Sequence, residues 1–317
     1  MKVLANDGVS KSGVDALEAS GFEVITTKVA QEQLIDYINK NKIDVLLVRS
    51  ATKVRKDLID ACPALKVIGR GGVGMDNIDV EYAREKGRTV FNTPAASSAS
   101  VAELVFAHLY NGVRFLYDAN RNMPLEGESR FGDLKKAYAK GVELKGKTLG
   151  IIGFGRIGQA TAKVALGAGM KVIYHDPYIE NATVTLDFYD GQNLDFKFES
   201  MSKEEVLKTA DFVSLHVPAQ KEYVIGKDEI AMMKNGAGLV NAARGGVIDE
   251  VALIDALDSK KLAFAGLDVY ENEPKPAIKV LMNANVSLSP HIGAATNEAQ
   301  DRIGIELADQ IKAALKN

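Results

Sequence analysis

The chain has 317 residues, of which 46% are apolar and 26% charged, with a net charge of −3. This length is long for one hydrophobic core, so we expect two domains. The weak negative charge gives no reason to expect nucleic acid or an anionic membrane as a partner. The single cysteine, Cys62, excludes an internal disulfide and a cysteine-based metal cluster, and no metal is expected. No apolar run approaches membrane-spanning length, and the N-terminus reads as a strand instead of a signal peptide, which predicts a cytoplasmic protein.

The N-terminal part of the chain alternates short apolar strands with amphipathic helices. Strands are expected over residues 2–5, 23–25, 44–49, 66–69 and 89–92, with helices over 11–20, 31–40, 54–61 and 80–86. This alternation is typical of a parallel sheet covered on both faces. We therefore expect one complete α/β domain before about residue 94.

Two loops of this first domain directly follow strands, where open α/β sheets bind their ligands. Backbone N–H groups of a glycine-rich loop can face a carboxylate, and arginine side chains can hold a phosphate. Solvated surface cations and a flexible turn are an equally good interpretation of the spacing alone. The residues that we predict to bind a substrate here are Arg49, Ser50, Arg70, Gly72 and Val73.

A connector of small residues, 92–98, leads into a helix expected over about residues 100–118 and opened by a capping box of Ser100 and Glu103. The helix is apolar nearly all round, which predicts a position at an interface between domains or subunits. His108 within it is interpreted as a packed core histidine. Residues 120–141 are polar and are expected to form an exposed excursion.

An apolar stretch, residues 147–152, runs into the motif Gly153-x-Gly155-x-x-Gly158 and a helix expected over 156–166. The first glycine permits a tight turn, the second lets a pyrophosphate approach the backbone, and the third lets the helix pack against the strand. Free N–H groups at the helix N-terminus favour an anion. Asp176 ends the next strand, where such folds place the acid that binds the adenosine ribose. Its charge repels the extra phosphate of NADP, so the motif predicts NAD as the cofactor.

The remaining chain continues the alternation after an acidic and aromatic segment, 177–200, which we interpret as a surface insertion, with a hairpin as one option. A second capping box, Ser202 with Glu205, opens the next helix. Strands are expected over 212–217, 238–242, 263–269 and 286–289. The last helix, about 297–315, can fold back onto the first domain, which would make that domain discontinuous.

Three later loops at strand ends supply a cationic, an acidic and an imidazole side chain: Arg244, Glu273 and His291. Hydride transfer between a hydroxy acid and NAD needs such a set. Arg244 can bind the substrate carboxylate, His291 can take the hydroxyl proton, and Glu273 can orient His291. Each alone could be a loop cation, a surface acid or a packing residue, but together, beside a dinucleotide motif, they favour catalysis.

The sequence resembles the D-2-hydroxyacid dehydrogenase family. The resemblance rests on the glycine motif with Asp176 and on the segments 214–218, 241–246, 267–274 and 290–295. It implies that Arg244, Glu273 and His291 are the catalytic residues. The cofactor-binding residues expected from the motif and the resemblance are Gly153, Gly155, Arg156, Ile157, Gly158, Asp176, His216, Val217, Pro218, Ala242, Asp268 and Gly293.

The same resemblance implies an α/β fold of two Rossmann-like or flavodoxin-like parallel-sheet domains. A discontinuous substrate-binding domain is expected to comprise residues 1–94 and 290–317, and an NAD-binding domain residues 95–289. It also implies a homodimer built through the cofactor domain. The chain ends at Asn317 without the C-terminal regulatory domain of longer relatives, so feedback control by serine is not expected.

Segments 48–54, 69–79 and 92–94 are most similar to family members that oxidise 3-phospho-D-glycerate to 3-phosphohydroxypyruvate, the first step of serine biosynthesis. In those members the arginines that match Arg49 and Arg70 help to bind the substrate. A hydroxypyruvate, glyoxylate or D-lactate type reductase is an alternative, and an NAD-sensing interaction protein is an alternative of another class. The family's Trp-x-Arg-type segment is missing, and Lys135 or Lys136 is a candidate replacement for its arginine.

Overall fold

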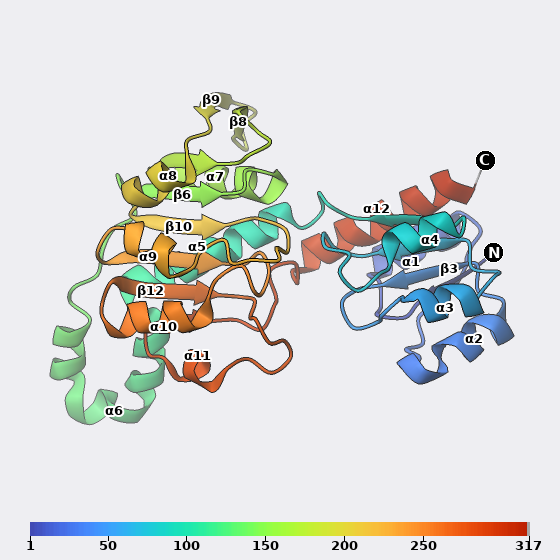
Figure 1. Ribbon diagram of the computed structural model, residues 1–317, viewed down its shortest axis with the longest axis horizontal. Coiled ribbons are helices and arrows are strands. Elements are labelled where there is room, and N and C mark those ends of the chain that lie inside the picture. Colours follow the sequence, from blue (N-terminus) through green and yellow to red (C-terminus); the bar gives the residue numbers. More distant parts are fainter. Residues whose placement is uncertain (316–317) are drawn as a thin grey trace. The chain divides into compact units, whose positions relative to one another are not determined.

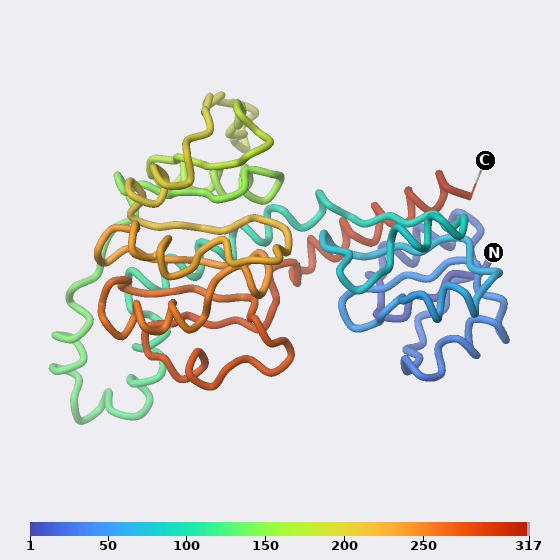
Figure 2. Tube along the Cα trace, in the orientation of Figure 1, coloured from blue at the N-terminus to red at the C-terminus, as the bar shows by residue number. Residues whose placement is uncertain are grey.

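The computed structural model describes residues 1–315, which form two compact units. Unit 1 comprises Met1–Ser100 and the C-terminal segment from Ala294, and unit 2 comprises Val101–Gly293. Figure 2 traces the chain from unit 1 through unit 2 and back into unit 1. Unit 1 is therefore discontinuous. The sequence predicts breaks at 94/95 and 289/290, whereas the two units divide after Ser100 and after Gly293.

Unit 1 is built on five parallel strands in the order β2-β1-β3-β4-β5, which is the flavodoxin-like order. The strands are β1 (Lys2–Ala5), β2 (Glu23–Ile25), β3 (Val45–Val48), β4 (Val67–Arg70) and β5 (Thr89–Asn92). One face is covered by α2 (Leu34–Asn41), which follows the 3₁₀ turn η1 (Gln31–Gln33), and by α3 (Lys56–Ala61) and α4 (Val80–Glu85). The other is covered by α1 (Lys11–Ala19) and α12 (Asn297–Leu315).

The return of the C-terminal helix to unit 1 is fixed by close packing against α1. A Cβ added at Gly13 would lie 2.7 Å from the Cα of Gly304, so the two helix backbones approach too closely for larger residues. The Ser12 hydroxyl also donates to Asp301 at 2.6 Å. Leu307 of α12 is 2% exposed and belongs to the same hydrophobic cluster as Leu17 of α1. The expected fold-back of the last helix is confirmed.

Unit 2 contains a sheet of six parallel strands in the order β13-β12-β11-β10-β6-β7. Its strands are β6 (Thr148–Ile152), β7 (Lys171–His175), β10 (Phe212–Leu215), β11 (Ala237–Asn241), β12 (Leu262–Leu267) and β13 (Val286–Leu288). The chain moves from β6 to one side with β7 and then to the other side with β10. The loop after β6 therefore lies where the strand order reverses, which is the usual ligand site of such sheets.

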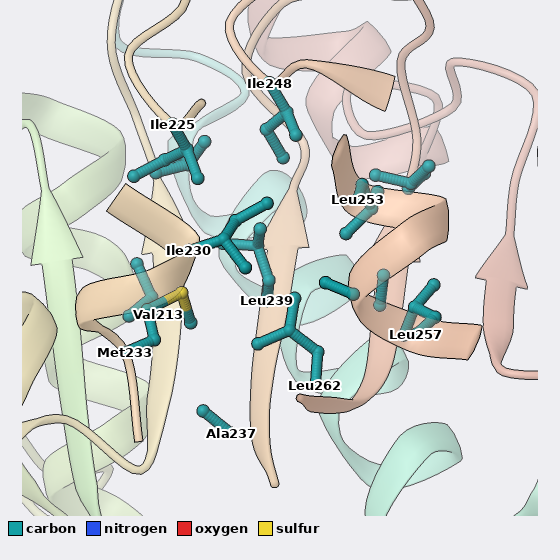
Figure 3. Close-up of a cluster of buried hydrophobic side chains, with 14 of the residues drawn as sticks. Val213, Ile225, Ile230, Met233, Ala237, Leu239, Ile248, Leu253, Leu257 and Leu262 are labelled. Carbon is teal, nitrogen blue, oxygen red and sulfur yellow. The ribbon is translucent and has the colours of Figure 1, made fainter. Parts of the chain in front are cut away.

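Both faces of the unit 2 sheet are buried, because successive strand residues point to opposite sides. Leu239 belongs to one hydrophobic cluster and its neighbour Val240 to the other. The first cluster (Figure 3) packs under α8 (Lys203–Thr209), α9 (Lys227–Met232), α10 (Glu250–Asp258) and α11 (Ile278–Met282). The second packs under α5 (Ser98–Arg114) and α7 (Arg156–Gly167). Each buried leucine or isoleucine of these layers contributes about 1.5 to 3 kcal/mol relative to an exposed one.

The insertion after β7 is the antiparallel hairpin of β8 (Asn181–Asp187) and β9 (Asn193–Glu199), so the hairpin interpretation is confirmed. Val184 on its inner face is 1% exposed and joins the cluster under α7. The ring of Phe198 lies 5.9 Å from that of Phe154. The hairpin extends beyond the β7 edge of unit 2 (Figure 1).

Two predictions about α5 are wrong. The helix begins at Ser98, so Ser100 is not its N-cap, and the Ser100 hydroxyl lies 2.8 Å from Thr296 Oγ1 instead of capping the helix. The helix also ends at Arg114, because Phe115 adopts a left-handed conformation with φ of 56°. The second capping box is confirmed, since Ser202 and Glu205 bond reciprocally.

The segment expected as an exposed excursion forms a further helix, α6 (Leu116–Ala137), with non-helical backbone at Arg130. It leaves unit 2 on the side of the strands' amino-terminal ends (Figure 1). Leu134 is its buried residue, whereas Leu125 is 82% exposed and Phe131 59% exposed. In the described part of the chain, no helix is long and apolar enough to cross a membrane. The cytoplasmic location stays a prediction.

Candidate active site

The carboxyl ends of five unit 2 strands are level with one another. Ile152 pairs with Leu215, Leu215 with Asn241, Asn241 with Leu267, and Leu267 with Leu288. The loops that begin directly after these paired strand ends carry nearly all of the predicted cofactor and catalytic residues of unit 2. The structure therefore gathers these residues along one edge of the unit 2 sheet.

The glycine loop after β6 has two glycines that the protein's own packing requires. A Cβ at Gly153, where φ is 90°, would lie 2.6 Å from the His216 carbonyl oxygen, and a Cβ at Gly158 would lie 2.3 Å from the Gly153 carbonyl oxygen. Gly155 differs, because no atom lies within 4 Å of a Cβ placed there. The open space over Gly155 is a cradle that the fold itself does not need.

This cradle fits the pyrophosphate of a dinucleotide. Gly155 is the N-cap of α7 and makes no side-chain cap, so the first amide groups of the helix face outward without a capping side chain. Free N–H groups and the helix dipole together favour a phosphate. Arg156 is exposed at the first turn, and Ile157 is half-buried beside it. These residues would hold the cofactor's phosphates.

Asp176, directly after β7, holds the glycine loop in place. One carboxylate oxygen accepts from the Phe154 N–H at 2.7 Å, and the other accepts from the N–H groups of Tyr178 at 2.8 Å and Ile179 at 3.1 Å. The carboxylate therefore faces the loop that would carry the pyrophosphate. This position suits the predicted bond to the adenosine ribose.

His216, after β10, has a buried ring with a hydrogen-bond partner at only one of its two nitrogens. Its Nε2 lies 2.9 Å from the Ser214 hydroxyl, and its Nδ1 is buried without a hydrogen-bond partner. Burial lowers the pKa of His216 to about 3, so the ring stays neutral at physiological pH. Val217 is half-buried, Pro218 is exposed, and Ala242, at the next strand end, is buried. The orphaned nitrogen is consistent with a ligand-lining position.

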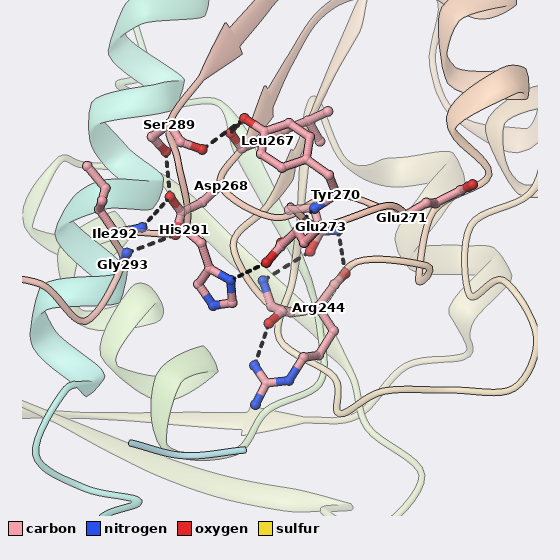
Figure 4. A network of polar contacts seen from close by, with 12 residues as sticks. Arg244, Leu267, Asp268, Tyr270, Glu271, Glu273, Ser289, His291, Ile292 and Gly293 are labelled. Atoms are coloured by element: carbon pink, nitrogen blue, oxygen red, sulfur yellow. Dashed lines mark hydrogen bonds and ion pairs between the residues drawn. The ribbon is translucent and has the colours of Figure 1, made fainter. Parts of the chain in front are cut away.

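Glu273 and His291 form a close pair (Figure 4). His291 Nδ1 lies 2.8 Å from one Glu273 oxygen, and the other Glu273 oxygen accepts from the Tyr270 N–H at 3.0 Å. An ionised carboxylate only accepts hydrogen bonds, so in the neutral ring Nδ1 carries the proton and Nε2 the lone pair. The His291 side chain is 47% exposed, so Nε2 is accessible to a substrate. This is the geometry of an oriented general base.

The loop that carries Arg244 packs directly against the loop that carries Glu273. A Cβ at Gly245 would lie 1.8 Å from the Tyr270 carbonyl oxygen, which only glycine allows. The turn itself is held by Asn241, whose side chain donates to the Arg244 carbonyl at 2.8 Å. The Arg244 guanidinium donates to the Ala243 carbonyl at 2.6 Å. The structure thus brings the loops of Arg244 and Glu273 together, as the sequence predicts.

The loop of His291 is fixed by Asp268, which is 1% exposed. Its two oxygens accept from the N–H groups of Ile292 and Gly293, each at 2.8 Å. His291 itself has a φ of 56°, a left-handed conformation that costs a non-glycine residue on the order of 1 kcal/mol or more. These two hydrogen bonds hold the chain in that conformation.

Tyr270 connects the same loops from within the core. Its hydroxyl lies 2.8 Å from the Ser289 carbonyl and 3.2 Å from the Leu267 carbonyl. Burial raises the pKa of Tyr270 to about 12, so the hydroxyl remains a donor at physiological pH. The loops of Arg244, Glu273 and His291 are therefore one packed assembly.

In unit 1, Arg49 and Ser50 line a cavity of about 380 Å³ together with Asp7 and Lys28. Asp7 anchors the loop that carries them: its carboxylate accepts from the Arg49 N–H at 2.7 Å, and from the N–H and hydroxyl of Thr52 at 3.0 and 2.7 Å. The wall of the cavity thus carries two cations, Lys28 and Arg49, and one acid, Asp7, whose carboxylate is hydrogen-bonded to the Arg49 loop.

Arg70, Gly72 and Val73 lie outside the set of residues that line this cavity. Arg70 donates from Nε to the Asn77 side chain at 3.0 Å, and Asn77 in turn donates to the Arg49 carbonyl at 2.7 Å. A Cβ at Gly72 would lie 2.7 Å from the Arg70 guanidinium. Arg70 is thereby connected to the Arg49 loop through one side chain.

Sequence reasoning missed Asp7 and Lys28. Both follow strands, Asp7 after β1 and Lys28 after β2, which is the same signal that pointed to Arg49 and Arg70. It also missed Ser289, whose hydroxyl donates to Asp268 at 2.6 Å. Across residues 1–315, no group of three or more His, Cys, Asp or Glu side chains is arranged to hold a metal ion.

The fold and this edge of the sheet together define a dinucleotide-dependent dehydrogenase. Residues 106–293 match the family described as D-isomer specific 2-hydroxyacid dehydrogenase, NAD binding domain. The chain belongs to the D-isomer specific 2-hydroxyacid dehydrogenase family, and unit 2 is its NAD-binding domain.

Two relatives with equal sequence identity to this chain have different substrates in their names, so the comparisons do not decide the substrate. The chain is 43% identical to a D-3-phosphoglycerate dehydrogenase of Methanocaldococcus jannaschii, over 100% of this chain and 58% of that protein. It is also 43% identical to a hydroxypyruvate reductase of Thermotoga maritima, over 98% of this chain and 97% of that one. Among solved structures, D-lactate dehydrogenase from Aquifex aeolicus, complexed with NAD and lactic acid, shows 31% identity and a TM-score of 0.76, over 100% and 96% of the two chains.

Proposed function

We propose that the protein transfers hydride between 3-phospho-D-glycerate and NAD, giving 3-phosphohydroxypyruvate, the entry step to serine. The observation that carries this proposal is the unit 1 cavity, whose lining includes two cations, Lys28 and Arg49, together with Ser50. Two cations at one cavity suit a phosphate, a group that an unphosphorylated hydroxy acid lacks.

The chemistry proposed for unit 2 follows from its hydrogen bonds. His291 Nε2 takes the hydroxyl proton of the substrate, and Glu273 stabilises the imidazolium that forms, since it already accepts from Nδ1. Arg244 binds the substrate carboxylate, exchanging its present bond to the Ala243 carbonyl for a charge-assisted one. NAD, when bound, accepts the hydride from the substrate carbon. The pKa of about 3 at His216 argues against that histidine as the base.

The first experiment follows NADH by absorbance with 3-phosphoglycerate, phosphohydroxypyruvate, hydroxypyruvate, glyoxylate and D-lactate. We expect the highest kcat/KM for the phosphorylated pair. Arg49→Ala should lower kcat/KM for phosphohydroxypyruvate by roughly 10- to 150-fold, because a hydrogen bond to a charged group contributes about 1.5 to 3 kcal/mol. For hydroxypyruvate the change should be far smaller.

Lys53→Ala is the matched control, because Lys53 is an exposed cation of the same loop that does not line the cavity. Equal losses for phosphorylated and unphosphorylated substrates in Arg49→Ala would reject the phosphate role. A wild-type preference for hydroxypyruvate would favour the second candidate, a hydroxypyruvate reductase, for which the Thermotoga maritima relative speaks. If the protein binds NADH but turns over none of the five substrates, the result would favour an NAD-sensing role.

We further propose a homodimer formed through unit 2. The α6 helix exposes large apolar side chains that a second copy would cover, namely Leu116, Met123, Leu125 and Phe131. Light scattering after size exclusion should give twice the chain mass, and Leu125→Lys with Phe131→Lys should shift it toward the monomer. A monomeric wild-type protein at micromolar concentration would refute the dimer.

A further inference from the structure

His108 is a buried polar residue that the proposed reaction does not use. It lies in α5, is 2% exposed and rests over β12, where a Cβ at Gly266 would lie 2.5 Å from the His108 Cβ. Both ring nitrogens have partners at the β13 end of the sheet. Nδ1 lies 2.9 Å from the Ser287 hydroxyl, and Nε2 lies 2.9 Å from the Ser289 hydroxyl.

The direction of these hydrogen bonds can be assigned from the bond between Ser289 and Asp268. Asp268 accepts at 2.6 Å from the Ser289 hydroxyl, which has only one hydrogen. Ser289 must therefore accept from His108, and Nε2 carries the ring proton. In the neutral ring Nδ1 is then an acceptor for the Ser287 hydroxyl. Burial lowers the pKa of His108, with Asp268 partly opposing the shift, which agrees with a neutral ring.

The chain of hydrogen bonds ends at the backbone of the catalytic loop. Asp268 receives the N–H groups of Ile292 and Gly293, the two residues that follow His291. His291 has a φ of 56° and does not hold this conformation by preference. The orientation of Asp268 therefore bears directly on the position of the His291 ring.

We infer that His108 is a positioning residue, which acts through Ser289 and Asp268 to hold the loop of His291 in its working conformation. The ordered path runs from the Ser287 hydroxyl to His108 Nδ1, from His108 Nε2 to Ser289, from Ser289 to Asp268, and from there to the loop backbone. This inference rests on the proposed role of His291 as the base.

Spectroscopy tests the path without reference to turnover. In protein labelled with ¹⁵N at histidine, we expect His108 to show an unprotonated Nδ1 and a protonated Nε2, and to stay neutral at physiological pH. Ser287→Ala should shift the Nδ1 resonance, and Ser289→Ala the Nε2 resonance. A protonated Nδ1 in the neutral ring would overturn the assigned direction.

Kinetics test the consequence. His108→Leu should lower kcat by about 10- to 100-fold, because misplacing a catalytic group by about 1 Å costs on the order of 10²-fold. His108→Gln, whose amide supplies both N–H donors and a carbonyl acceptor, should restore most of the turnover. Leu109→Ala is the control, since it removes a fully buried apolar side chain from the same helix and should lower the melting temperature while sparing kcat below that temperature.

Equal kcat values in the leucine, glutamine and wild-type proteins would overturn the positioning role, as would equal losses in both variants. A His291→Ala protein that keeps its turnover would instead refute the proposed base. The two failures are therefore distinguishable, because the spectra of His108 do not depend on the reaction.

Discussion

Gly155 is a position where a side chain would leave the packing of the fold unchanged but would obstruct the proposed cofactor site. A Cβ at this position meets no atom within 4 Å, and its φ of −67° is ordinary for alanine. Alanine narrows the unfolded ensemble, which stabilises by about 0.4 to 1 kcal/mol, but it caps a helix less well than glycine by up to about 1 kcal/mol. We therefore expect Gly155→Ala to change the free energy of unfolding by less than about 1 kcal/mol.

The effect on cofactor binding should be much larger. The added methyl group occupies the space above the first turn of α7, where a pyrophosphate must approach the backbone. We expect the Kd of NADH to rise at least about tenfold, which corresponds to about 1.4 kcal/mol. Fluorescence titration with NADH gives the Kd, and thermal unfolding of the free protein gives the stability.

Two further glycines of α7 provide controls. A Cβ at Gly167, the last residue of the helix, also meets nothing, so Gly167→Ala should leave the Kd of NADH unchanged. Gly158→Ala should destabilise the free protein, by about 1 to 3 kcal/mol, because its Cβ would lie 2.3 Å from the Gly153 carbonyl oxygen. An unchanged Kd in Gly155→Ala would refute the placement of the pyrophosphate over this residue.

Three other predictions follow from single side chains. Asp176→Ser should narrow the preference for NADH over NADPH in kinetic assays with both cofactors, and an unchanged preference would reject its ribose contact. Asp211→Asn should destabilise the protein by about 1 to 3 kcal/mol at about pH 7. Burial of Asp211 opposes ionisation, but hydrogen bonds from the Thr148 N–H and Lys234 lower its pKa below 3.8. Its stabilising effect is present above the unfolded pKa and is lost as pH falls through the lower folded pKa, so urea titrations of the two proteins should converge in acid. Tyr270→Phe should cost about 1 to 3 kcal/mol of unfolding free energy by removing the hydroxyl donor of the Ser289 carbonyl, whereas the Leu267 carbonyl keeps the Ser289 N–H; a smaller change would show that the Ser289 carbonyl finds another donor.

The strands and the glycine loop were predictable from sequence because local signals and tertiary context agree there. Each parallel strand is a short apolar run. Gly158 is required by a contact within the loop, with the Gly153 carbonyl, and Gly153 by the His216 carbonyl after the neighbouring strand β10. The alignment of strand ends then follows from the parallel pairing of β6, β10, β11 and β12. This is why residues far apart in sequence, such as Arg244 and Glu273, could be assigned to one edge.

Other features depend on contacts that no local pattern encodes. Ser100 and Glu103 have the spacing of a capping box, but Thr296, nearly two hundred positions away in the chain, takes the Ser100 hydroxyl. The helix break at Phe115 could not be predicted, because no glycine or proline stands at the break and phenylalanine rarely adopts a left-handed conformation. His108 has the spacing of a core residue, and only the structure shows that its ring meets Ser287 of β13 and Ser289 just after that strand.

The most direct test of the account is the hydride-transfer step itself in His291→Ala. Single-turnover reduction of the preferred 2-oxo acid by NADH should slow by on the order of 10² to 10⁴, while the Kd of NADH stays at the wild-type value. That result would place proton transfer at His291 and leave the cofactor site intact. A rate within about threefold of wild type would contradict the account, because the hydrogen bonds of the other three histidines in the described residues are to serine hydroxyls or a backbone carbonyl and not to a carboxylate.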